Sequence, residues 1–262
     1  MKMRSMALMV LGALVATPPV FAEDELVAEE APSELPTADE LMRAMDSNLQ
    51  FETRSATMTM RVNDGRRTRE YTMVTYGRGE EDAAIEYLAP ERERGTRMLK
   101  LDDQLWLYMP RAERVQKISG HMMRQGMMGS DMSYEDMMAG AEFHEMYSAE
   151  VTGSEQLDGR LHWRLEATAR DNSVAYARRV ILIDAETRIP TRQELYAVSG
   201  MLMKTWTMGD VREIGGQMTP MHMEVVDALR EGSSTEIVIS DLQYGIELEE
   251  EVFSQRWLER GR

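Results

Sequence analysis

Apolar and polar residues alternate along most of the chain after residue 55. Ala56, Met58, Met60 and Val62 would share one face of an extended segment, with polar residues between them. This two-residue period is typical of a β-strand with one buried face, and turn sequences such as Asp-Gly separate the segments. We predict about 11–12 antiparallel strands, the later ones near 68–76, 82–88, 97–101, 104–109, 147–155, 160–169, 176–184, 191–198, 201–213, 217–226 and 234–244, with 114–118 as a candidate for one more short strand.

Two segments depart from this alternation. Thr37 and Glu40 form a capping box, and the apolar residues after them recur at helical spacing, which predicts a helix over 37–48. Residues 119–140 contain four Gly, seven Met and no β-branched residue, which indicates an insert of short helices and irregular chain. A last helix or turn is expected near 249–258.

The predicted fold is therefore mainly β. A long antiparallel meander tends to curl into a barrel or half-barrel. We expect one large curled sheet, a half-barrel, whose concave face is covered by the N-terminal helix and by the central insert. We assign this single domain to residues 37–262.

The N-terminus has the order of a secretory signal. Lys2 and Arg4 precede an uncharged run over 6–16, and Val20 and Ala22 suit signal peptidase. The alternative is a membrane anchor, but this run is shorter than the roughly 20 apolar residues that a spanning helix needs. We predict a signal peptide over 1–22, cleaved near Ala22, an acidic disordered leader over 23–36, and a periplasmic location.

Composition narrows the choice of partners. The net charge of −16 disfavours binding to nucleic acid and to anionic membranes, although it also serves solubility. The chain has no Cys, so its core must hold it together without disulfides. It contains 25 Met, an unusual number.

The methionines allow three interpretations. They can fill a core, they can line an adaptable apolar ligand surface, or their thioethers can bind Cu(I). The sequence Met218-Thr-Pro-Met221-His222-Met223 is the best copper candidate. The insert cannot bury all its methionines by regular packing, so it is the best candidate for a ligand surface, with Met122, Met123, Met127, Met128, Met132, Met137 and Met138.

Little in the sequence suggests catalysis. There is no Gly-x-Ser-x-Gly motif and no phosphate-binding Gly loop. His162 alternates with charged residues on a predicted solvent-exposed face and is interpreted as structural. The acidic loop over 129–136 is either a cation or acid–base site, or the start of a short helix over 134–138 capped by Asp131 or Ser133. We favour the helix.

Three pieces of sequence resemble the outer-membrane lipoprotein-sorting (LolA-like) periplasmic family. They are Tyr87-Leu-Ala-Pro followed by Gly95-Thr-Arg-Met-Leu, then Leu105-Trp-Leu-Tyr-Met-Pro with Arg114-Val, and then the loop that contains Gly129, Ser130, Asp131, Tyr134 and Asp136. The resemblance is sharp over 87–136, about a fifth of the chain. The richness in methionine departs from the family pattern.

The resemblance implies a half-barrel around an apolar cavity and no catalytic role. Such a carrier would bind acyl chains of lipoproteins or other lipids and move them towards the outer membrane, in some relatives beside an inner-membrane transporter. No cofactor, nucleic acid or stable membrane insertion is expected. Met58, Met60, Trp106 and Tyr108 are the candidate cavity wall, under a lid formed by the insert methionines. A Met-rich copper-binding module is the main alternative; a lipid hydrolase using Ser130 is a weaker one.

Overall fold

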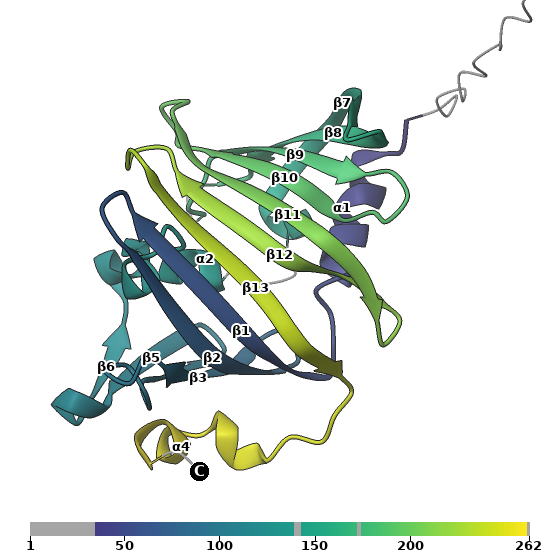
Figure 1. The fold of residues 1–262 in the computed structure, drawn as a ribbon. Helices are drawn as coiled ribbons and strands as arrows, with labels where there is room; N and C mark the ends of the chain where they lie inside the picture. The colour runs from purple at the N-terminus through teal and green to yellow at the C-terminus, as the bar shows by residue number, and fades with distance from the viewer. Residues whose placement is uncertain (1–34, 139–142, 172–173, 261–262) are drawn as a thin grey trace, which may run out of the picture. The chain divides into compact units, whose positions relative to one another are not determined.

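Thirteen antiparallel strands form one open sheet. The structure is a computed structural model that describes residues 35–138, 143–171 and 174–260. The strand order is β6-β5-β4-β3-β2-β1-β13-β12-β11-β10-β9-β8-β7 (Figure 1). The bounds are β1 Thr53–Asp64, β2 Thr68–Arg78, β3 Asp82–Ala89, β4 Arg97–Leu101, β5 Gln104–Met109, β6 Arg114–Ile118, β7 Tyr147–Leu157, β8 Arg160–Ala169, β9 Arg178–Asp184, β10 Pro190–Tyr196, β11 Leu202–Ile214, β12 Gln217–Asp227 and β13 Ser233–Tyr244.

The predicted half-barrel is confirmed, and it has one strand more than the predicted 11–12. Helical segments accompany the sheet: α1 Ala38–Ser47, α2 Tyr134–Met138, α3 Phe143–Met146 and α4 Gln255–Arg260, with 3-10 turns η1 Pro110–Ala112, η2 Gly120–Arg124, η3 Met127–Gly129 and η4 Glu250–Phe253. The predicted signal and all but the last two residues of the predicted leader lie outside the described residues.

The connection from β6 to β7 explains the central insert. These two strands are the opposite edges of the sheet, so the chain between them must cross one of its faces. The insert, which contains η2, η3 and α2, and then α3 lie on this connection, and Figure 1 shows α2 lying across one face. No described helix has the length and apolar character that crossing a bilayer requires.

Near β2–β5 both faces of the sheet are covered, because successive side chains of each strand point to opposite faces and both sets are buried. Tyr87, Met98 and Leu105 belong to a core that also contains Met127 and Met132 of the insert. Residues of opposite phase, such as Ala84 and Leu99, pack instead with η4 and α4. The insert therefore covers the concave face, and the C-terminal segment covers the outer face.

Helix α1 covers the other end of the concave face. Its predicted capping box is present: the Glu40 amide donates to the Thr37 hydroxyl, and the Thr37 amide donates to the Glu40 carboxylate. Leu41 of α1 packs in a core with Trp163, Leu165 and Ile181 of β8 and β9. Buried Asp46 accepts hydrogen bonds from the amides of Phe143 and His144, 2.9 and 3.1 Å, which joins α1 to α3.

The predicted position of His162 on a solvent face is wrong. Only 3% of His162 is exposed. Its Nδ1 lies 3.0 Å from the Arg160 carbonyl oxygen, and its Nε2 lies 3.9 Å from the buried carboxylate of Asp184 on β9. A polar side chain can be buried when such partners surround it. These contacts are consistent with a structural role for His162 inside the protein.

Candidate functional site

An apolar hollow opens on the concave face, between the part covered by α2 and the part covered by α1 and α3. Its volume is about 420 Å³, which is within the range of roughly 300–1,000 Å³ for ligand pockets. The sheet contributes apolar side chains from β10, β11 and β12, and α2 and α3 contribute one methionine each. These residues are Leu195, Trp206, Met208, Met223, Met138 and Met146. Polar side chains, Glu135, Asp136, Arg179 and Gln193, form a smaller part of the lining.

The part of the concave face under η2, η3 and α2 is filled by the protein's own side chains. Met60, Met73 and Met98 of the sheet are fully or almost fully buried, and Met127 and Met132 of the insert pack against them. Met is unbranched and flexible, so it fills the irregular gaps that remain where the sheet packs against a segment without regular structure. The sulfur-rich core thus occupies the part of the half-barrel under η2, η3 and α2, and it leaves the neighbouring hollow open.

Asp131 attaches the insert to the end of β13. Its side chain is fully buried. It accepts hydrogen bonds from the hydroxyls of Ser233 and Thr235, 2.7 and 2.9 Å, and from the Arg230 guanidinium, 3.1 Å. The Asp131 amide donates to the Thr235 hydroxyl, 2.9 Å, so the loop is held by backbone and side chain together.

Asp136 attaches α2 to β11. It accepts hydrogen bonds from the Lys204 ammonium, from the Tyr176 hydroxyl at 2.6 Å and from the Ser133 amide at 2.7 Å. Burial by itself would raise the pKa of Asp136, but the Lys204 charge and these hydrogen bonds outweigh it and hold the pKa below its ordinary value. Burial and the nearby Asp136 raise the pKa of Tyr176.

These contacts agree with the helix-capping interpretation of the acidic loop. The Ser133 hydroxyl accepts from the Asp136 amide, 3.1 Å, so Ser133 caps the short helix that was predicted over 134–138. Among the described residues, no group of three or more His, Asp or Glu side chains is arranged to hold a metal ion. The Ser130 hydroxyl is buried and donates to the Met132 carbonyl. The loop therefore fixes the position of α2, one wall of the hollow.

The predicted lid and wall residues divide into groups. Met138 lines the apolar hollow. Met60, Met127 and Met132 are buried in the adjacent core, and Met58, Met122, Met123, Met128 and Met137 pack against it partly buried. Of the loop residues, Tyr134 belongs to that core, while Asp136 stands at the rim of the hollow. A direct contact of the core methionines with a ligand stays a prediction.

Trp106 and Tyr108 lie away from the other predicted residues. They pack with Trp257 and Phe253 of the C-terminal segment, on the outer face of β5. Arg97, whose guanidinium carbon is 5.2 Å from the Tyr108 ring centre, donates to the carbonyls of Trp257 and Leu258. The aromatic strand thus holds the C-terminus in place, and we do not include these two aromatics in the binding site.

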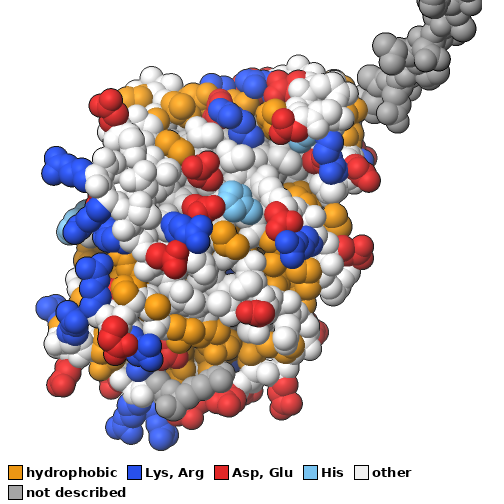
Figure 2. Space-filling view, viewed as in Figure 1, with side chains coloured by type: hydrophobic (Ala, Val, Ile, Leu, Met, Phe, Trp, Pro, Cys, Tyr) orange, Lys and Arg blue, Asp and Glu red, His pale blue; other side chains and the backbone are white. Residues whose placement is uncertain are grey.

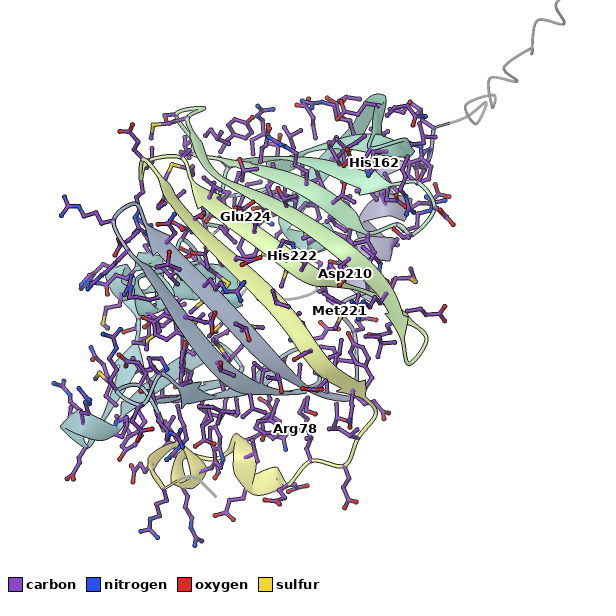
Figure 3. The ribbon with its side chains drawn as sticks, in the orientation of Figure 1. Arg78, His162, Asp210, Met221, His222 and Glu224 are labelled. Atoms are coloured by element: carbon purple, nitrogen blue, oxygen red, sulfur yellow. The ribbon has the colours of Figure 1, made fainter. Side chains whose placement is uncertain are left out.

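The best copper candidate is divided between two faces. Met221 is buried and Met223 lines the apolar hollow, whereas His222 between them points to the outer face (Figure 3). There His222 Nε2 lies 2.9 Å from the Glu236 carboxylate. Figure 2 shows positive and negative side chains mixed over this outer face. The three side chains do not converge, and we do not propose a copper site there.

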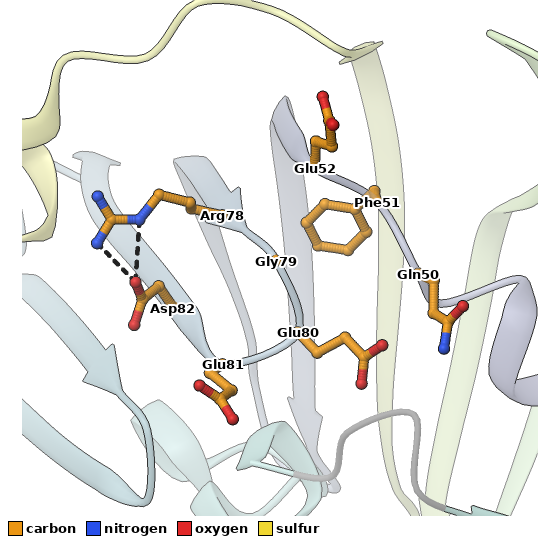
Figure 4. Close-up of a pocket in the computed structure, with 8 residues that line it drawn as sticks. All are labelled: Gln50, Phe51, Glu52, Arg78, Gly79, Glu80, Glu81 and Asp82. Atoms are coloured by element: carbon orange, nitrogen blue, oxygen red, sulfur yellow. Dashed lines mark hydrogen bonds and ion pairs between the residues drawn. The ribbon is translucent and has the colours of Figure 1, made fainter.

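Two polar hollows accompany the apolar one. One, of about 640 Å³, shares Glu135 and Tyr176 with it and is lined by Lys204 and Arg230. The other, also about 640 Å³, lies at the β2–β3 turn (Figure 4). Glu81 there has its pKa raised by a hydrogen bond and charge repulsion from Asp102. Most of the residues that line these two hollows are polar or charged, so both suit an apolar guest less well than the apolar hollow does.

The open, curled antiparallel sheet of this chain is the half-barrel fold that is also seen in a LolA superfamily protein and in a lipoprotein-sorting domain. A family model described only as that of an uncharacterized protein matches residues 79–260, most of the chain, and the chain belongs to that family. No protein of curated function matches the sequence.

Solved structures have the same fold. A DUF1329 family protein from Desulfovibrio piger is similar with 26% identity and a TM-score of 0.78, covering 84% of this chain and 97% of that one. A domain named for outer-membrane lipoprotein sorting, from Vibrio parahaemolyticus, has 24% identity and a TM-score of 0.77, covering 85% and 98%. A LolA superfamily protein from Nitrosomonas europaea has 24% identity and a TM-score of 0.70, covering 86% and 100%. The last two likenesses concern the fold.

Proposed function

We propose that this protein is a periplasmic carrier that binds an acyl chain of a lipoprotein or another lipid in the apolar hollow and moves it towards the outer membrane. The supporting observation is the hollow itself: an apolar cavity of about 420 Å³ on the concave face, which the protein's own side chains leave unfilled. The predicted export signal supports the location, and the similar sorting-type folds support the type of activity.

The energetics explain why such a hollow is needed. Moving one CH₂ group from water to an apolar site gains about 0.8 kcal/mol, so a chain of about 14 carbons resists leaving a bilayer by roughly 10 kcal/mol. A carrier that lowers this barrier must offer walls of similar quality. Trp206, Met208 and Met223 provide such walls, and flexible thioethers adapt to chains of different shape.

The proposal is for a binding protein and not an enzyme. Two residues near the hollow have shifted pKa values, Asp136 and Tyr176. Asp136 accepts hydrogen bonds from the Tyr176 hydroxyl and from the Lys204 ammonium, which links α2 to β11. We therefore assign them a structural role. An inner-membrane transporter is a reasonable partner for delivery or release.

A binding experiment with an uncharged chain tests this proposal. A fluorescent long-chain fatty alcohol should bind the protein saturably, and unlabelled alcohol should displace it. Met208→Trp places a larger side chain in the hollow and should weaken binding at least tenfold. Met201→Trp is the matched control, because Met201 lies outside the hollow at the β10–β11 turn and is 49% exposed. Absence of saturable binding, or equal binding by both variants, would contradict the proposal.

A further inference from the structure

A row of four residues crosses the concave face at the end of the sheet near the β2–β3 turn. Arg54 of β1 pairs with Gly77 of β2, Gly77 with Ala83 of β3, and Ala83 with Lys100 of β4. Neighbouring strands are about 4.8 Å apart, so the Cα atoms of the two cationic residues are separated by roughly 14 Å. The two small residues between them leave room that both long side chains can reach.

The side chain of Arg54 is held by a fitted aromatic contact. Its guanidinium carbon lies 4.4 Å from the centre of the Phe51 ring, which is a favourable cation–π distance. The ring and the Arg54 stem occupy the space above Gly77: a Cβ atom there would lie 2.8 Å from Phe51 Cε2 and 3.1 Å from Arg54 Cγ. The absence of a side chain at residue 77 is thus what allows this arrangement.

The charge of Arg54 lacks an anionic partner among the described residues. No carboxylate of the residues that the structure describes lies within 4.0 Å of it, and its neighbours are the Phe51 ring and the Tyr244 hydroxyl. Burial lowers the pKa of Arg54, and Tyr244 opposes this effect. Asp82, which lies nearby, is held by Arg78 at 2.6 Å (Figure 4). A partly buried charge without a counter-ion is costly, so the site favours an added anion.

The cations border a small pocket. It has a volume of about 100 Å³ and is lined by Arg54, Gly77, Ala83 and Lys100, with Met137 of α2 beside them. Lys100 is 9% exposed and donates to the Glu80 carbonyl, 3.1 Å. Asp82 and exposed Glu80 also line the pocket, and the charge of Asp82 is balanced by Arg78.

This pocket adjoins the apolar hollow. Leu49 lines both of them. The consecutive residues Met137 and Met138 of α2 line the small pocket and the hollow respectively. A ligand with a polar end at Arg54 could therefore continue past Leu49 into the space beside Met138 and Trp206.

We propose that the pocket binds the carboxylate of a long-chain fatty acid whose hydrocarbon chain occupies the apolar hollow. This inference rests on the proposed function and names the ligand class. The volume of about 100 Å³ accommodates a carboxylate group. Arg54 binds the two oxygens through its planar donor fork, and Lys100 supplies a second positive charge.

Matched ligands test the proposal without any change to the protein. At pH 8, where a carboxylic acid is ionised, palmitate and hexadecanol are compared as competitors of the fluorescent alcohol, with lysophosphatidylglycerol as a single-chain phosphate ester. Palmitate should bind at least tenfold more tightly than hexadecanol, equivalent to about 1.4 kcal/mol. Arg54→Gln should remove this preference and leave hexadecanol binding within twofold of wild type.

The control variant lies on the same strand. Arg61 of β1 points to the outer face and pairs with Glu70 and Glu236, so Arg61→Gln should keep the preference for palmitate. Equal binding of palmitate and hexadecanol by the wild-type protein would overturn this inference alone. So would a tighter binding of the phosphate ester than of palmitate, or a parallel loss of both ligands in Arg54→Gln. If the alcohol and the acid both fail to bind, the proposed carrier function fails with it.

Discussion

The ion pair between Lys204 and Asp136 should be a main attachment of the insert to the sheet. The two side chains are 11% and 4% exposed, and the carboxylate also accepts from Tyr176 and Ser133. Lys204→Met keeps the length of the side chain and removes the charge. It leaves a buried carboxylate beside α2 with its hydrogen bonds but without its counter-ion.

The expected cost follows from this burial. Removing one partner of a buried ion pair destabilises a protein by about 3–5 kcal/mol, whereas an exposed pair contributes roughly 0–1 kcal/mol. One kcal/mol corresponds to about 2–4 °C for a protein of 150–250 residues, so Lys204→Met should lower Tm by roughly 10 °C. The control is Arg212→Met on the same strand, since the Arg212–Asp210 pair is 61% and 48% exposed. It should change Tm by only a few degrees.

Urea denaturation followed by tryptophan fluorescence measures these free energies of unfolding. The double variant Asp136→Asn with Lys204→Met should cost clearly less than the sum of the two single variants, because the second change removes the charge that the first leaves unpaired. The reasoning is refuted if Lys204→Met costs no more than Arg212→Met, or if the single costs simply add.

Three further outcomes are expected. The pKa of Asp136 is lowered in the folded protein. Its ionised form therefore stabilises the fold above the ordinary pKa near 4, and this contribution is lost as the pH falls through the folded pKa. Wild type should lose more stability than Asp136→Asn between pH 5 and 3, and equal losses in urea titrations would contradict this. Tyr87→Phe removes a buried hydroxyl with no hydrogen-bond partner among the described residues. This change should be neutral or raise the free energy of unfolding by up to about 1 kcal/mol. Tyr71→Phe removes a hydroxyl that donates to the Met128 carbonyl and should lower the free energy of unfolding by about 1 kcal/mol. Gly77→Ala should displace the Phe51 ring and cost about 1–3 kcal/mol; a neutral effect on Tm would show that the ring moves freely.

Local patterns predicted the elements of this fold well. The capping box at Thr37 and Glu40 and the short helix begun by Ser133 depend on contacts three residues apart, which the sequence displays directly. Strand alternation located the strands for the same reason. It could not show which phase of β5 faces inward, because both faces of that strand are covered, one by the insert and the other by α4. Trp106 and Tyr108 were misplaced for this reason.

The residues of the candidate site could not be predicted from the pattern within single strands, because they come together only when the strands are arranged in the sheet. Met138 was predicted because it belongs to the methionine-rich insert, but Trp206, Met208 and Met223 come from strands whose place in the sheet the sequence did not reveal. The Arg54–Lys100 row depends on the register of four strands. The turns between these strands are short, so the register could have been predicted by pairing residues step by step away from each turn, and this would have found the row. The burial of His162 depends on Asp184, which is paired with it on the next strand, β9.

Native mass spectrometry of the protein purified from its own cell envelope tests the central claim most directly, because it reports whether an acyl chain occupies the hollow beside Met208. The account predicts a complex of one protein with one single-chain lipid, present in wild type and in Met201→Trp and depleted in Met208→Trp. A spectrum that contains only the bare protein, and remains unchanged after incubation with palmitate or hexadecanol, would contradict it.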